Sequence, residues 1–192
     1  MSEHPFVWVP GADPEAWLTH AYFRRELKLR TTPRRAEIHL FANTIYHLKV
    51  NGAFVGYGPA RAYPECPEYD TYDLAPFLRR GDNAIAVEVS HHGVTTFHHL
   101  LRPGCLVAWG EIRDGARRIS LATGEGWRCR KSDAHEPFPP RFSFAIGPIQ
   151  IFDERRAPAG WDRPGAPDAG WTEPVRIDAS AWGALRPAAF RT

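Results

Sequence analysis

The sequence predicts an all-β protein that folds as a single antiparallel β-sandwich. Short runs in which apolar and polar residues alternate recur along the chain, which is typical of strands with one buried face. Asn51-Gly52 separates two such runs and predicts a two-residue type I′ hairpin turn, because this dipeptide readily adopts positive φ angles. Eighteen Pro and 16 Gly supply the many short connections that an all-β domain requires.

The early strands are predicted at 21–29, 36–42, 46–50 and, after the hairpin turn, at 54–55. Short turns join them, and no segment with the helical period of 3.6 residues lies between them. Four strands in the first 57 residues indicate that consecutive strands pair as antiparallel neighbours.

The later strands follow turn signals. The segment 69–78 contains a turn at Asp73-Leu74, and Gly81-Asp82-Asn83 forms the next turn before a buried apolar strand at 84–89. A second hairpin is predicted at 105–113 and 118–122, and a late edge strand at 127–133. Proline then becomes frequent and strand patterns become scarce. We therefore predict a sandwich core over 1–135 and an irregular Pro-rich extension over 136–192.

The composition of the chain argues against several classes of protein. The 192 residues, 43% of them apolar with 7 Trp and 11 Phe, suffice for a packed core that buries roughly 70% of the unfolded surface. No stretch of about 20 apolar residues is present, and the N-terminus lacks the pattern of a signal peptide, so we expect a cytoplasmic protein with no membrane partner. Arginine pairs are scattered, which argues against a nucleic-acid partner. Cys66, Cys105 and Cys129 fit reduced thiols better than disulfides.

Four ordered motifs carry a family resemblance. They are Val50-Asn-Gly-x-x-Val-Gly-x-Gly-Pro-Ala-Arg61, Tyr69-Asp-x-Tyr-Asp-Leu74, Gly126-Trp-Arg-x-x-x-Ser-Asp133, and the segment 152–171 with its Gly-Trp-Asp and Gly-Trp elements. Their order resembles the galactose-binding-like jelly-roll sandwich and, more narrowly, the N-terminal domain of bacterial α-L-rhamnosidases and related family 78 glycoside hydrolases. The resemblance covers about Trp8 to Trp171.

This resemblance implies a non-catalytic accessory domain that packs on a helical-barrel catalytic domain or a neighbouring subunit and borders the sugar site. The catalytic acids of the family lie in that separate barrel, so we expect no catalytic residue in this chain, and the extension would lead toward a downstream domain. An alternative is a stand-alone carbohydrate-binding module for rhamnose-type sugars. A third hypothesis is a small hydrolase or metalloprotein built on the histidine-rich loop.

Candidate sugar or interface contacts follow the central hairpin. Arg61, Tyr63, Tyr69 and Asp70 combine aromatic faces with charged groups on one predicted loop, as sugar sites often do. The competing interpretation, which we favour, is that Arg61 pairs with Asp70 or Asp73 and simply orders the loop.

His92 is a further candidate because, in related rhamnose-binding modules, the corresponding loop helps to hold sugar and calcium. His91, His92, His98 and His99 could supply imidazole ligands, but their spacing matches no standard metal motif, and we favour a plain loop with exposed histidines. Calcium prefers carboxylate or amide oxygens, and 91–99 contains neither. We therefore predict no metal and no cofactor; calcium is an unsupported alternative.

Overall fold

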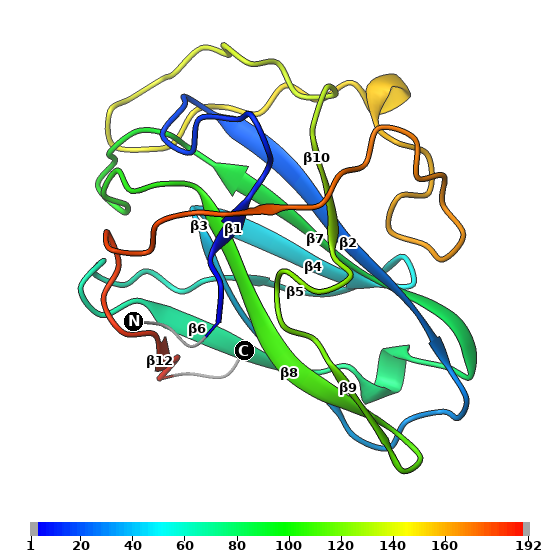
Figure 1. The fold of residues 1–192 in the computed structure, drawn as a ribbon. Helices are drawn as coiled ribbons and strands as arrows, with labels where there is room; N and C mark the ends of the chain where they lie inside the picture. The colour runs from blue at the N-terminus through cyan, green and yellow to red at the C-terminus, as the bar shows by residue number, and fades with distance from the viewer. Residues whose placement is uncertain (1–3, 190–192) are drawn as a thin grey trace.

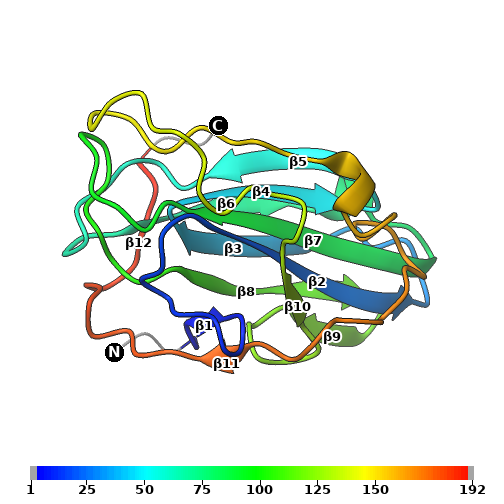
Figure 2. The ribbon, with the colours of Figure 1, turned by 90° about the horizontal axis from the view of Figure 1, so that it is seen from above.

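The computed structural model describes residues 4–189, which form two β-sheets packed face to face (Figure 1, Figure 2). Within these residues the helical content consists of two 3-10 turns, η1 (Ala75–Phe77) and η2 (Glu154–Arg156). The predicted all-β sandwich is confirmed. No helix in the described range is long and apolar enough to cross a membrane.

One sheet has seven strands and the other has five. From edge to edge, the first contains β11 (Val175–Arg176), β1 (Val7–Trp8), β8 (Cys105–Asp114), β3 (Ala36–Asn43), β6 (Glu68–Asp73) and β12 (Arg186–Pro187), with β9 (Arg117–Ser120) paired to β8. The second contains β10 (Arg128–Lys131), β2 (Thr19–Leu29), β7 (Gly81–His91), β4 (Ile45–Val50) and β5 (Ala53–Gly58). All pairings are antiparallel except the short one between β12 and β6.

The central hairpin forms as predicted. Along β4, Tyr46, Leu48 and Val50 are fully buried, while the residues between them are half-buried. The turn places Asn51 at φ 53° and Gly52 at φ 82°, as a type I′ turn requires. The Asn51 side chain then accepts a hydrogen bond from the Ala84 amide (2.9 Å) and so ties the turn to β7.

Three details differ from the predictions. Consecutive strands β2, β3 and β4 alternate between the two sheets instead of pairing, because the short connections after β2 and after β3 cross from one sheet to the other. Glu68–Asp73 is strand β6 and not loop, since it pairs with β3. Strand β7 already begins at Gly81, because β2 extends far enough to pair with it there.

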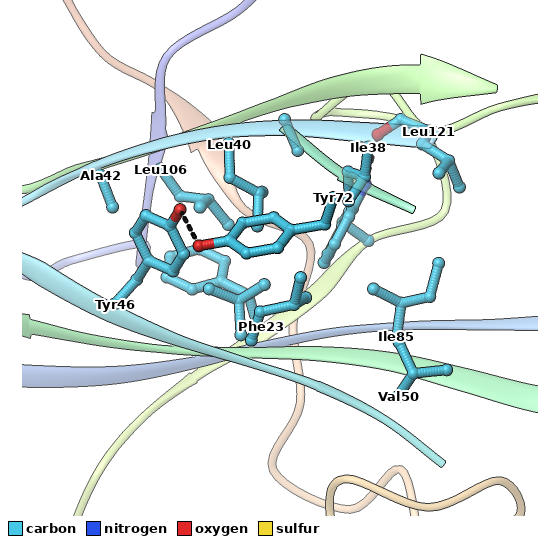
Figure 3. Packing of buried hydrophobic residues seen from close by; sticks show 14 of the residues in the cluster. Phe23, Ile38, Leu40, Ala42, Tyr46, Val50, Tyr72, Ile85, Leu106 and Leu121 are labelled. Atoms are coloured by element: carbon cyan, nitrogen blue, oxygen red, sulfur yellow. Dashed lines mark hydrogen bonds between the residues drawn. The ribbon is translucent and has the colours of Figure 1, made fainter. Parts of the chain in front are cut away.

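The core lies between the sheets. Inward side chains from both layers interdigitate there, including Phe23, Leu40 and Leu106 (Figure 3). Burying each such side chain contributes roughly 1.5–3 kcal/mol. The hydroxyls of Tyr46 and Tyr72 meet inside this core at 3.0 Å, so their polar ends stay paired.

The extension wraps the outer face of the five-stranded sheet. Trp161 and Trp171 are buried there against Tyr22 and Ala86. The guanidinium of Arg24 lies 4.5 Å from the Trp171 ring. Its Nη2 also donates to the backbone oxygens of Ala166 (2.9 Å) and Pro167 (3.2 Å) and contacts the Asp168 carboxylate. The same segment then crosses to the other sheet as β11 and β12; the division at residue 135 stays a prediction.

Candidate functional site

Three loops meet at one end of the sandwich, at the left of Figure 2. They are 59–67, 92–104 and 136–147, and we call this region the loop end. The first two touch where the Arg61 guanidinium contacts the His98 ring. The last two are joined because the Phe97 amide donates to the Ala145 oxygen (3.2 Å) and Arg141 donates to the Thr95 oxygen (3.1 Å).

These loops have internal supports that fix their shape. Arg141 Nε donates to the backbone oxygens of Ser143 (2.9 Å) and Ile146 (3.1 Å) within its own loop. Thr96 Oγ1 accepts from the amides of His98 (3.0 Å) and His99 (3.1 Å). The side chains that the loops display are therefore held by backbone that is already hydrogen-bonded.

A shallow pocket of about 480 Å³ opens between the first two loops, lined by 61–64 and 96–100. Its walls offer the phenol ring of Tyr63, the phenyl ring of Phe97 and the charged end of Arg61. Aromatic faces and a guanidinium can hold either a sugar or a protein side chain.

Five aromatic side chains on these loops are strongly exposed. We call them the aromatic loop surface: Tyr63, Phe97, Phe138, Phe142 and Phe144, each 72–80% exposed. The rings of Phe97 and Phe144 come from different loops, and their centroids lie 5.2 Å apart. Rings of this size left in water mark an interaction surface, because burying them is strongly favourable.

The five sequence candidates do not all gather here. Arg61 and Tyr63 line the pocket as loop residues. Tyr69 and Asp70 lie in strand β6, since they pair with β3 or β12. The Tyr69 ring packs edge-on against Trp109 at 4.6 Å. His92 is close by but buried.

Asp70 has a structural partner inside the sandwich. It accepts a hydrogen bond from the Tyr46 hydroxyl at 2.5 Å. Burial raises the pKa of Asp70 above its usual value, although this hydrogen bond opposes the shift. The favoured ion pair of Arg61 with Asp70 or Asp73 was wrong: within residues 4–189 Arg61 instead contacts His98. Asp70 accepts from the Tyr46 hydroxyl, and Asp73 accepts from the Ala75 amide at 2.9 Å.

The prediction of four exposed histidines was also wrong for two of them. β7 continues through His91, which is only 1% exposed. His92 follows the strand and is 8% exposed, because Gly147 of the extension packs against its ring. His91 packs edge-on against Trp8 at 5.9 Å. Burial lowers the pKa of both imidazoles to about 4, so both are neutral at pH 7. His98 is exposed as predicted, whereas His99 is half-buried.

One polar cluster was not predicted from the sequence. His20, Glu88 and His135 place their ligand-type atoms within 4.8 Å of one another. They are far apart in sequence and form no motif. Glu88 lies in the predicted strand 84–89, and His20 directly precedes the predicted strand 21–29, but strand patterns cannot reveal which strands are neighbours.

The comparisons with known proteins agree with this architecture. A family model described as the α-L-rhamnosidase N-terminal domain matches residues 31–189. The crystal structure of a GH78 family rhamnosidase of Bacillus sp. GL1 has 30% sequence identity and a TM-score of 0.84, over 97% of this chain and 20% of that chain. An α-L-rhamnosidase of Streptomyces avermitilis is 27% identical over 149 residues, which are 71% of this chain and 14% of the relative.

A lectin from Pleurotus ostreatus shares the fold, with a TM-score of 0.62 and 22% identity over 97% of this chain and 46% of the lectin. That likeness concerns architecture alone. The chain thus spans 14–21% of the length of the rhamnosidases that it matches. Since the family model covers most of the sequence, this chain belongs to the α-L-rhamnosidase N-terminal domain family.

Proposed function

We propose that this chain is a non-catalytic accessory domain of an α-L-rhamnosidase-like glycoside hydrolase, and that its aromatic loop surface packs on the catalytic part of the same enzyme. The observation that carries the proposal is the gathering of Tyr63, Phe97, Phe138, Phe142 and Phe144 at one end of an otherwise well-packed sandwich.

The relatives support this proposal by their length. In the rhamnosidases that match, a region corresponding to this chain makes up only 14–21% of the polypeptide. A domain that is one part of a larger enzyme needs a surface on which the remainder can pack, and interface cores are rich in aromatic residues.

A second candidate function is carbohydrate binding in the pocket between Arg61 and Phe97. The observation that favours it is the combination of exposed aromatic rings with a guanidinium in one depression. A rhamnose-type sugar would stack its apolar face on Tyr63 or Phe97 and accept hydrogen bonds from Arg61.

Direct binding measurements test the first function. The chain and the polypeptide encoded downstream of it are produced separately, and their dissociation constant is measured by calorimetry. We expect a complex, and we expect the Phe142→Ser/Phe144→Ser variant to weaken it by roughly tenfold or more, since buried aromatic anchors dominate interface energies. Phe54→Ser/Tyr57→Ser is the matched control, because Phe54 and Tyr57 are also exposed aromatics but lie on strand β5, outside the aromatic loop surface. Loss of binding in the control alone would contradict the proposal.

Titration with L-rhamnose and rhamnosides tests the second function. Sugar binding that Arg61→Ala abolishes would favour the carbohydrate-binding module. The absence of heat in every titration, together with a stable protein complex, would leave the accessory role.

A further inference from the structure

The cluster of His20, Glu88 and His135 lies between the five-stranded sheet and the extension. His20 belongs to β2 and Glu88 to the adjacent strand β7, so both project from the outer face of the sheet. His135 approaches from the segment that follows β10 and precedes the extension. The two imidazole rings stack with centroids 3.6 Å apart and a tilt of 3°.

Hydrogen bonds fix which ring nitrogen of His135 is available. Ser132 Oγ donates its proton to the Tyr22 hydroxyl (3.1 Å). Since a hydroxyl has one proton, Ser132 Oγ must act as acceptor toward His135 Nδ1, 2.8 Å away, and Nδ1 carries the hydrogen. Nε2 of His135 then carries no hydrogen, and its lone pair faces Glu88 Oε1, 3.6 Å away.

A lone pair that faces a carboxylate is repulsive unless a cation lies between them. No hydrogen bond from residues 4–189 reaches the Glu88 carboxylate in this arrangement.

His20 provides the second independent observation. Its side chain is almost fully buried, and Nε2 has no hydrogen-bond partner. Its other nitrogen, Nδ1, lies 3.0 Å from Ser90 Oγ, which also accepts from Gln150 of the extension at 3.4 Å. A buried ring nitrogen without a hydrogen-bond partner destabilises the folded chain unless a ligand satisfies it. Both imidazoles are therefore held at Nδ1 by a serine, which is how metal-ligating histidines are oriented. Nε2 of His20 is left without a partner, and Nε2 of His135 faces Glu88.

We propose that His20, Glu88 and His135 form a binding site for a divalent transition-metal ion of the zinc type, which fastens the C-terminal extension to the five-stranded sheet. Two neutral imidazoles and one carboxylate form a donor set that zinc accepts, with a water as fourth ligand. Zinc–ligand bonds of about 2.0–2.1 Å require the ligand atoms to approach within roughly 3.3 Å of one another. The imidazoles therefore tilt out of their stack when the ion enters.

The test uses the full 192-residue chain, purified without a histidine tag and treated with chelator. Cobalt(II) is added as a spectroscopic probe and zinc as its competitor. We expect a single site with the visible absorption of tetrahedral cobalt, displaced by zinc, and weakened by roughly tenfold or more in Glu88→Gln and in His135→Ala. Glu88→Gln preserves the shape of the side chain, and circular dichroism of each variant verifies folding.

Matched controls separate this site from casual surface binding. Glu136→Gln and His98→Ala change an exposed carboxylate and an exposed imidazole, and both should bind cobalt as the wild type does. Zinc should also slow proteolytic cleavage within 136–171 of the wild type but not of Glu88→Gln. No tetrahedral cobalt site, or binding that survives both ligand variants, would overturn the metal site. Binding without protection of the extension would overturn the fastening role.

Discussion

The two ends of the sandwich differ in how completely they satisfy their own side chains. At the hairpin end, Asn51 and Asn83 hydrogen-bond to each other and to surrounding backbone, and Lys49 pairs with Asp162 at 3.0 Å. At the loop end, aromatic rings lie in water and buried His92 leaves Nδ1 without a partner. The polar groups of Asn51, Asn83 and Lys49 are thus paired within the chain at the hairpin end, whereas the loop end has five strongly exposed rings and an unpaired buried imidazole nitrogen.

Lowering the pH should destabilise the loop end, and we expect this to be the largest of the effects. Above about pH 6.5, His91 and His92 are neutral in both the folded and the unfolded chain, so stability is fully present. Between about pH 6.5 and pH 4 only the unfolded chain takes up protons, because the folded pKa of each is about 4. Stability therefore falls as the pH falls, by roughly 2 kcal/mol for each histidine between pH 7 and pH 5.

Urea unfolding at several pH values measures this slope. The variant His92→Gln should reduce the change of unfolding free energy with pH by the contribution of one histidine. His98→Gln, at an exposed position in the same loop, is the control and should keep the wild-type slope. Equal slopes for all three proteins would show that the buried loop-end histidines do not set the acid sensitivity.

Asn83→Ala should have the next largest effect, at the hairpin end. The side chain is fully buried and makes four hydrogen bonds, to Arg79 through both its amide and its oxygen, to the Gly81 oxygen, and to Asn51. Truncation leaves buried backbone groups unpaired, so we expect a loss of about 2–4 kcal/mol in the free energy of unfolding. Denaturant unfolding at pH 7 provides the measurement, and a loss below 1 kcal/mol would mean that water replaces the side chain.

Tyr46→Phe should lower the free energy of unfolding by a smaller amount, about 1–3 kcal/mol. It removes one hydroxyl from the chain that joins Tyr72, Tyr46 and Asp70, and leaves the Asp70 carboxylate without that donor. Unfolding measured on Tyr46→Phe and on Tyr46→Phe/Asp70→Asn separates the two contributions, because the amide relieves the unpaired charge. A double variant as unstable as the single one would contradict this account.

Phe142→Ser/Phe144→Ser should have the smallest effect on stability, within roughly 0.5 kcal/mol, because both rings are exposed. Its thermal unfolding should match that of the wild type while its partner binding is reduced. A large loss of stability would show that these rings support the loop end itself and are not reserved for a partner.

Prediction from sequence succeeded where local chemistry decides the structure. Asn51-Gly52 specifies its own turn, and the alternation of Tyr46, Leu48 and Val50 specifies which face is buried. It failed for Asp70 and for His92. Asp70 became a strand residue because β3 was available to pair with it. His92 became buried because Gly147 of the extension packs against its ring.

The sequence by itself determined the class of fold, the central hairpin and the family, since alternation, turn residues and ordered motifs are local properties of the chain. Only the tertiary structure decided that β2, β3 and β4 alternate between sheets, that three distant loops present aromatic rings together, and that His20, Glu88 and His135 converge. The physical reason is that a strand pattern fixes which face of a strand is buried, whereas strand partners and loop contacts depend on segments that lie far away in the chain.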